Sequence, residues 1–138
     1  MRRVLFDSDV LLDILAQRQP FVVAFAQALN MVTQPQVQGY VSGHAVTNIF
    51  YILRRQVGSE TARELLSRLL QHLQIANVTD EVIRAALQSS MTDFEDAVTS
   101  EAANAAGVEV IVTRNTSDFL ASVTPAVLPD EFLVMPLE

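Results

Sequence analysis

The chain opens with an apolar run that ends in a carboxylate, Val4-Leu5-Phe6-Asp7-Ser8-Asp9-Val10-Leu11-Leu12-Asp13. A short buried strand followed at once by an amphipathic helix produces this pattern. Asp7 would then lie at the carboxyl end of the strand, where open α/β sheets bind their ligands. Because a carboxylate there is costly unless something neutralises it, we expect Asp7 to be paired, to cap a helix or to bind a metal.

Strand-like and helix-like segments alternate along the rest of the chain. The predicted strands span residues 2–6, 39–42, 75–78, 108–113 and 126–128. The predicted helices span residues 8–17, 21–31, 43–57, 59–70, 79–87 and 92 to about 106. This alternation predicts an α/β three-layer sandwich in which helices flank a central, mostly parallel β-sheet. We expect one domain over residues 1–138.

Composition narrows the classes of protein and of site. Half of the 138 residues are apolar and 18% are charged, as in a folded globule. No apolar run approaches the roughly 20 residues of a membrane span, and the acids near the N-terminus do not fit a secretion signal. The absence of cysteine excludes disulfides and thiolate metal sites and favours a cytoplasmic location. Because His44 and His72 are too few for a usual zinc site, any metal would be a hard cation bound by oxygen.

The charge balance also limits the partners. The formal net charge is −7, and all nine basic residues are arginines. This excess of acid argues against a broad basic surface for nucleic acid. It leaves open a local groove lined by arginine, and a divalent metal among carboxylates would change the field there.

Four carboxylates are expected at one edge of the sheet. Asp7 ends the first strand, Asp118 follows the strand near residue 110, and Asp93 and Asp96 begin the helix that precedes that strand. The ordinary alternative is that each has a separate role as a cap, a turn residue or a first-turn acid. As a set, they favour a site for Mg²⁺ or Mn²⁺.

Four segments carry a resemblance to a known family. They are Phe6-Asp7-Ser8-Asp9-Val10-Leu11-Leu12-Asp13, the helix at residues 45–55, Asp93-Phe94-Glu95-Asp96-Ala97-Val98 with Ala102 and Ala103, and Val112-Thr113-Arg114-Asn115-Thr116-Ser117-Asp118-Phe119. In order and content these resemble the four motifs of PIN-domain proteins, the fold of the toxin ribonucleases in VapBC-type toxin–antitoxin pairs. The resemblance spans about residues 3 to 120.

The resemblance implies a metal-dependent phosphodiesterase. Asp7 and Asp96 match the metal-binding acids of the first and third motifs. Asn115 or Asp118 would supply the fourth-motif ligand, and Thr113 would be a nearby hydroxyl donor. The expected catalytic residues are thus Asp7, Asp96, Asp118 and Asn115, and the expected metal ligands are Asp7, Asp96, Asp93 and Asp118.

The second motif departs from the family. Its usual Glu falls at Asn48, and an amide is a weaker, uncharged ligand that cannot act as a base. Asp93 or Glu95 would have to compensate. The expected substrate-binding residues are Asn48, Thr113, Arg114 and Ser8.

The implied reaction is hydrolysis of single-stranded or loop RNA that leaves a 5′-phosphate. Mg²⁺ or Mn²⁺ would polarise the scissile phosphate and activate water, and Asp96 or Asp118 would position that water. Arg114, and also Arg54 or Arg55, would meet backbone phosphates, with plain surface solubility as the alternative. The resemblance also implies a small antitoxin partner and a homodimer, with the helix at residues 61–73 as a candidate contact, and no membrane.

Two rival interpretations remain open. With Asn48 in the acid position, the chain would be a degenerate, weakly catalytic PIN domain that serves as a partner-binding module. The pattern Asp7-Ser8-Asp9 after an apolar strand also fits a phosphatase of the haloacid-dehalogenase type, with Asp7 as nucleophile and Asp9 as acid. That family usually needs a downstream lysine, which this chain lacks.

Overall fold

β1 (Arg2–Phe6) is the central strand of a sheet of five parallel strands in the order β3-β2-β1-β4-β5. The computed structural model describes residues 2–19 and 22–136. The other strands are β2 (Val37–Ser42), β3 (Leu73–Ala76), β4 (Val110–Val112) and β5 (Ala126–Val127). The helices are α1 (Ser8–Leu15), α2 (Val22–Asn30), α3 (Gly43–Val57), α4 (Ser59–Leu69), α5 (Asp80–Leu87), α6 (Phe94–Ala105) and α7 (Pro129–Leu133), with short 3₁₀ helices η1 (Met31–Thr33) and η2 (Thr116–Phe119).

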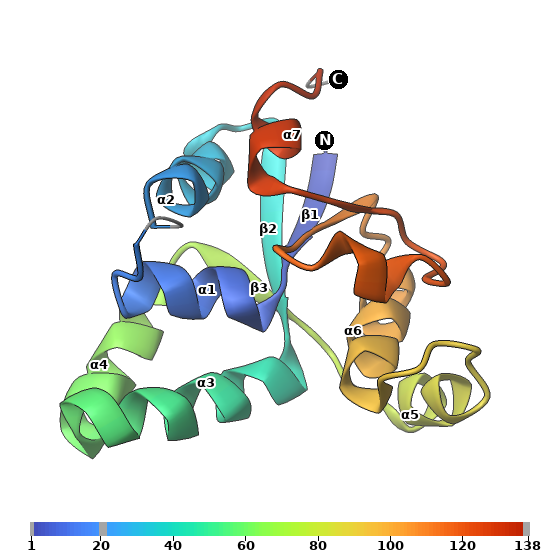
Figure 1. Ribbon diagram of the computed structural model, residues 1–138, viewed down its shortest axis with the longest axis horizontal. Coiled ribbons are helices and arrows are strands. Elements are labelled where there is room, and N and C mark those ends of the chain that lie inside the picture. Colours follow the sequence, from blue (N-terminus) through green and yellow to red (C-terminus); the bar gives the residue numbers. More distant parts are fainter. Residues whose placement is uncertain (1, 20–21, 137–138) are drawn as a thin grey trace.

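Helices cover both faces of the sheet, and the residues of β1 show why. Val4 and Phe6 are fully buried in one apolar cluster, whereas Leu5 is fully buried in another. Successive side chains of a strand point to opposite faces, so an unbroken apolar run is typical of a strand that is buried on both. Helices α1 to α4 and α7 form the first cluster, and α5 and α6 form the second (Figure 1). The predicted three-layer α/β sandwich is confirmed.

Several element boundaries differ from the prediction. The strand expected at residues 108–113 spans only Val110–Val112, and the Val108 amide donates instead to the Ala103 carbonyl at the end of α6. The strand expected at 75–78 lies earlier, at Leu73–Ala76. The helix expected to reach residue 17 ends at Leu15, and Gln17 adopts a left-handed φ of 53°.

Other differences concern helices. The helix expected over 21–31 spans Val22–Asn30 and continues as η1, and its expected start at Phe21 lies outside the described residues. Helix α7 was not predicted, because its single turn is too short to show a period. Within the described residues, no helix is both long and apolar enough to cross a bilayer.

Gly39 in β2 provides a test of how tightly the sheet packs against its helical layer. A Cβ atom at Gly39 would lie 2.6 Å from Leu73 Cδ2 and 2.6 Å from Val32 Cγ1. We expect Gly39→Ala to lower the free energy of unfolding by about 1–3 kcal/mol through overpacking. Gly43→Ala is the matched control, since its nearest atom would be 3.5 Å away. Urea unfolding measures both variants, and equal midpoints would contradict this packing.

Candidate active site

The carboxyl ends of β1 and β4 place Asp7 beside Thr113. Phe6 pairs with Val112, and the amide of Asp7 donates to the Val112 carbonyl at 3.0 Å. β1 pairs with β2 on one side and with β4 on the other, so the order of strands reverses between β1 and β4. Open α/β sheets form their ligand-binding crevice at such a point.

Asp7 is a buried carboxylate that also caps a helix. Its side chain is 9% exposed and accepts hydrogen bonds from the Ser8 amide at 2.9 Å and the Thr113 hydroxyl at 3.0 Å. Burial, followed by the negative charge of Asp9, raises the pKa of Asp7 to about 7, against the opposing effect of the two hydrogen bonds. The charge of Asp96 adds a smaller increase. Asp7 is therefore a carboxylate that gains from a nearby cation.

Asp9 joins Asp7 through the residues after β4. The Asn115 side-chain amide donates to Asp9 Oδ2 at 2.8 Å, and the Thr113 hydroxyl lies 3.4 Å from the same oxygen. Thr113 in turn accepts from the Asn115 backbone amide at 3.1 Å. Burial is the main cause that raises the pKa of Asp9. The fully buried Thr113 is thus the link between the two carboxylates.

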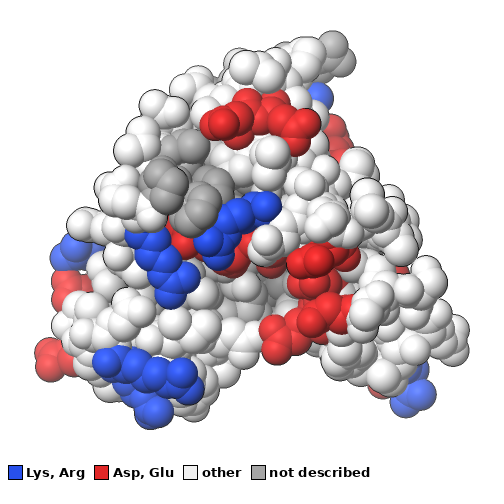
Figure 2. All heavy atoms as spheres, viewed as in Figure 1, with Lys and Arg blue, Asp and Glu red and all other residues white. Residues whose placement is uncertain are grey.

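A second group of acids lines a neighbouring hollow of about 320 Å³. Asp93, Asp96 and Asp118 are on its wall. Asp93 is the N-cap of α6, because its Oδ1 accepts from the Asp96 amide at 3.0 Å. Burial, with the charges of Asp93, Asp118 and Asp9, raises the pKa of Asp96 to about 6. Figure 2 shows acidic side chains gathered on one side of a central hollow and basic side chains on the other.

The donors fit a hard divalent cation held loosely. Among residues 2–19 and 22–136, no three His, Cys, Asp or Glu side chains are close enough to share a metal ion. Mg²⁺ needs only one or two carboxylates, since it keeps several waters. Asp7 and Asp96 offer oxygen donors, and a cation beside them would offset the burial and the like-charge repulsion that raise their pKa values. The described residues thus suit an ion with few direct ligands rather than a closed cage.

Asn48 contacts a carboxylate from another helix. Its side-chain amide on α3 donates to Glu95 Oε2 on α6 at 3.1 Å. One turn earlier on α3, His44 Nδ1 lies 2.6 Å from the hydroxyl of the buried Ser42. Burial lowers the pKa of His44, although the charge of Glu95 opposes this. Glu95 therefore faces both polar residues at the start of α3.

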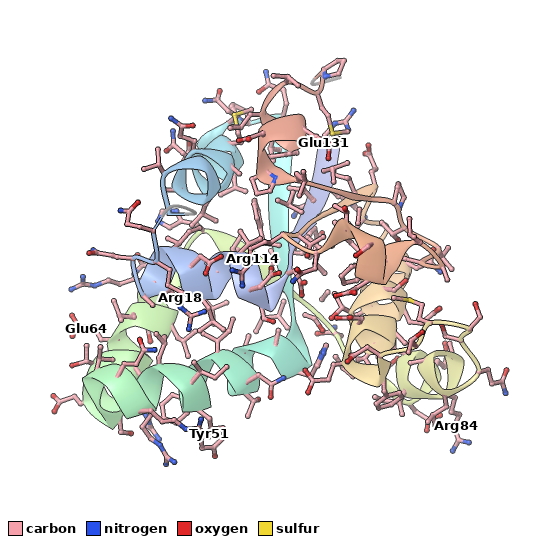
Figure 3. The ribbon with its side chains drawn as sticks, in the orientation of Figure 1. Arg18, Tyr51, Glu64, Arg84, Arg114 and Glu131 are labelled. Carbon is pink, nitrogen blue, oxygen red and sulfur yellow. The ribbon has the colours of Figure 1, made fainter. Side chains whose placement is uncertain are left out.

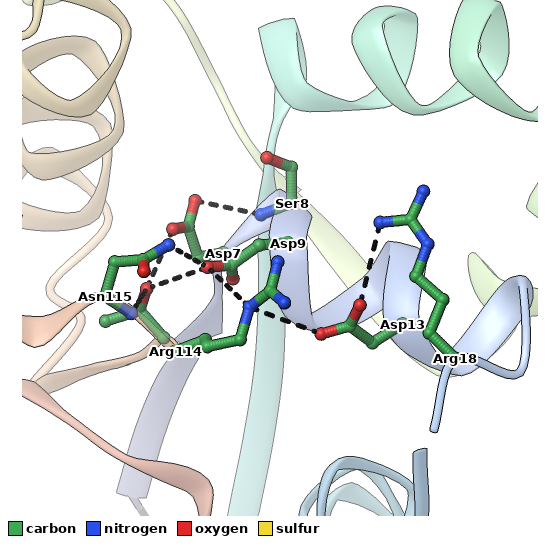
Figure 4. A network of polar contacts seen from close by, with 8 residues as sticks. Asp7, Ser8, Asp9, Asp13, Arg18, Arg114 and Asn115 are labelled. Carbon is green, nitrogen blue, oxygen red and sulfur yellow. Dashed lines mark hydrogen bonds and ion pairs between the residues drawn. The ribbon is translucent and has the colours of Figure 1, made fainter. Parts of the chain in front are cut away.

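Arg114 binds two aspartates of α1. Its Nε lies 3.9 Å from Asp9 Oδ2 and 3.6 Å from Asp13 Oδ2. Arg18 Nη1 lies 3.6 Å from the other oxygen of Asp13. Figure 4 shows the resulting chain of contacts from Asp7 to Arg18.

The structure distributes the predicted residues over several contacts. Asp7, Ser8, Thr113 and Asn115 gather at the strand ends, Asp93, Asp96 and Asp118 line the hollow, and Asn48 pairs with Glu95. Arg54 and Arg55 lie in the last turn of α3, where Arg54 stacks over Tyr51. Figure 3 shows Tyr51 at the edge of the molecule and Arg114 at its centre.

Three residues of this network were not predicted as part of the metal site. Asp9 was given a role only in the phosphatase alternative, Asp13 was part of the first motif without a role, and Arg18 was not considered. The sequence feature that could have revealed this network is Asp13, an acid flanked by Leu12 and Ile14 within the apolar helix. A charged residue in such a position is seldom buried unless it is paired.

The match to a family model decides the affiliation of the chain. The PIN domain model matches residues 3–117. The chain belongs to the PIN-domain family. PIN nucleases generally use divalent metal ions. No curated protein matches the chain significantly.

Solved structures of toxin–antitoxin proteins share the fold. A toxin–antitoxin complex from Klebsiella pneumoniae is 23% identical with a TM-score of 0.70, over 91% of this chain and 97% of that chain. VapBC2 from Rickettsia felis, bound to a DNA fragment from its promoter, is 11% identical with a TM-score of 0.73, over 91% and 98%. VapC20 from Mycobacterium tuberculosis, named as a toxin that cleaves the sarcin-ricin loop, is 13% identical with a TM-score of 0.63, over 78% and 86%.

The raised pKa of Asp7 predicts a pH-dependent stability. Between its ordinary value of 3.8 and about 7, the folded state binds more protons than the unfolded state. The free energy of unfolding in chelator-treated buffer should therefore fall, by on the order of a few kcal/mol, as the pH rises through this range. Asp7→Asn should remove much of this fall, whereas Asp80→Asn, on the exposed surface of α5, should keep it. Urea titrations at several pH values test this, and an unchanged fall in Asp7→Asn contradicts it.

Proposed function

We propose that this protein is a Mg²⁺- or Mn²⁺-dependent endoribonuclease that cleaves single-stranded or loop RNA. The observation that carries the proposal is that Asp7 and Asp96 lie near enough for the charge of Asp96 to raise the pKa of Asp7. Two carboxylates from distant parts of the chain that repel each other in a partly buried place are typical of a site for a cation. The PIN-family affiliation supports nuclease chemistry at this place.

Each residue has a defined task in this proposal. A divalent ion, when bound, supplies a Lewis acid for the scissile phosphate. Asp7, at the end of β1, and Asp96, on α6, would hold that ion. The Thr113 hydroxyl and the Ser8 amide orient the Asp7 carboxylate through their hydrogen bonds. Asp118, which lines the same hollow as Asp96, would position the attacking water.

We further propose that Glu95 compensates for the amide at position 48. The hydrogen bond from Asn48 at 3.1 Å holds the Glu95 carboxylate near α3, where the family pattern has its second acid. In this arrangement α6 supplies the charge and α3 supplies the residue that orients it.

The biological role in this proposal is that of a toxin in a VapBC-type pair. Similarity of fold to toxin–antitoxin complexes supports a small antitoxin partner, and a neighbour named for cleavage of the sarcin-ricin loop supports a structured-loop RNA substrate. A homodimer, a single domain and a cytoplasmic location complete the proposal.

The main test removes one carboxylate at a time. Asp7→Asn and Asp96→Asn should each reduce RNA cleavage by about a hundredfold or more, because each removes a charge that holds the ion. In metal-free buffer neither should lower the midpoint of thermal unfolding, because like-charge repulsion falls. Asp80→Asn is the control. End sequencing of the products measures cleavage, and normal cutting by both variants would show that the site is wrongly assigned.

A second test concerns the amide at position 48. Glu95→Gln should lower kcat/KM for RNA by about tenfold or more, as the loss of a metal-orienting neighbour usually does. Glu101→Gln, farther along α6, is the control. Wild-type cleavage by Glu95→Gln would show that Glu95 does not compensate.

The rival candidate is a partner-binding PIN module, which the amide at position 48 favours. Isothermal titration of the purified chain with Mn²⁺ separates the two. A nuclease should bind Mn²⁺, and Asp7→Asn should weaken that binding. A module should show no such heat and should still fold.

A further inference from the structure

Asp13 is a buried carboxylate that the proposed reaction does not use. It lies on α1 with a side chain that is 0% exposed, and both carboxylate oxygens lack a hydrogen-bond partner in the described residues. Such a group is strongly disfavoured unless cations lie beside it. Arg18 and Arg114 provide them, each 3.6 Å from a different carboxylate oxygen.

The two arginines come from different parts of the chain and reach the same carboxylate. Arg18 lies just after α1, and its backbone amide also donates to the Asp13 carbonyl at 2.9 Å. Arg114 follows β4. Their side chains are 36% and 33% exposed, so part of each guanidinium faces solvent while part faces Asp13. In Figure 4 the two guanidinium groups flank the Asp13 carboxylate and reach its two oxygens from different directions.

Arg18 and Arg114 lie next to the acidic crevice, on the side away from Asp96. Arg114 also contacts Asp9, which belongs to the network of Asp7. Asp13 lies about 9 Å beyond Asp7 along α1, at a rise of about 1.5 Å per residue. Figure 3 shows Arg18 and Arg114 where Figure 2 shows basic side chains across the hollow from the acidic group.

The charges define the kind of ligand. The net charge of the chain is −7, so its overall field repels a polyanion. Arg18, Arg114, Asp13 and Asp9 together are formally neutral, in a chain that is otherwise strongly acidic. The two guanidinium groups are therefore the hydrogen-bond donors that this place offers to an anion. A planar guanidinium suits a phosphate group better than any other common anion except a carboxylate.

We propose that Arg18 and Arg114, held together by Asp13, form a cationic subsite that binds a backbone phosphate of single-stranded nucleic acid next to the acidic crevice. This inference rests on the proposed function, because it assigns the subsite to the same substrate. Arg18 and Arg114 touch the phosphate, and Asp13 is a positioning residue that acts through them.

Salt-dependent binding tests the subsite separately from cleavage. A short fluorescent oligouridine is titrated with the full chain in buffer without divalent ions, over a range of NaCl concentrations. Arg18→Gln should weaken binding several-fold and reduce the slope of log Kd against log salt by about 0.7, the value for one phosphate contact on a single strand. Arg18→Lys should restore the slope.

Arg84→Gln is the matched control, because this substitution changes the net charge by the same amount as Arg18→Gln. Arg84 pairs with Asp80 on the exposed surface of α5. Its slope should equal that of the wild type. In cleavage assays, Arg18→Gln should raise KM and leave kcat unchanged, because it removes binding away from the reacting phosphate.

Asp13→Asn distinguishes positioning from simple electrostatics. The variant makes the protein less negative, so a purely electrostatic effect would tighten oligouridine binding. Positioning predicts weaker binding instead, because the two guanidinium groups lose their common anchor. Tighter binding overturns the role of Asp13.

The outcomes separate this inference from the proposed function. If no RNA is cut but Arg18→Gln still reduces the salt slope, the nuclease proposal fails and the subsite stands. If RNA is cut and Arg18→Gln leaves both slope and KM unchanged, the subsite is wrong. Absence of oligouridine binding by the wild-type chain also overturns it.

Discussion

The parallel pairing of β1 with β4 is the interaction on which the site depends. It brings Thr113 next to Asp7 and buries both at the point where the strand order reverses. Because both faces of β1 are covered by helices, a carboxylate at its end cannot simply turn to solvent. The hydrogen bonds from Ser8 and Thr113 offset only part of that cost, and the pKa of Asp7 stays raised. The fold thus creates a place where a cation is favourable.

The crevice has an acidic side and a basic side, and this difference would orient a charged ligand that binds across it. Acids from α6 and η2 lie on one side, and the arginines around Asp13 lie on the other. A polyanion would be repelled from the first side unless a divalent ion were present, whereas the second side offers it two guanidinium groups without one. A nucleic-acid strand that crosses the crevice would therefore be oriented before any chemistry begins.

Much of this arrangement was predictable, because the ends of strands and the starts of helices depend on a few neighbouring residues. The opening run of apolar residues placed Asp7, and the acids Asp93 and Asp96 placed the start of α6 to within two residues, with Asp93 as its N-cap rather than inside it. The contact between Asn48 and Glu95 was not predictable, since it depends on how α3 and α6 approach each other. Asp13 was missed because an amphipathic helix tolerates one acid, and its arginine partners lie in separate segments. The β-branched run at residues 108–113 predicted a longer strand than β4, because the Val108 amide donates its hydrogen bond to the end of α6 instead of to a neighbouring strand.

The buried triad of Asp13, Arg18 and Arg114 is better explained by function than by stability. Replacement of a buried ion pair by apolar side chains of similar volume is often neutral or stabilising, so a leucine at position 13 would serve α1 at least as well. A helix that places an acid among Leu12, Ile14 and Leu15 departs from its own pattern, and such departures concentrate at functional sites. The triad also meets the network of Asp7 through Asp9. A carboxylate that serves only the core would not need to hold two half-exposed cations at the edge of the acidic crevice.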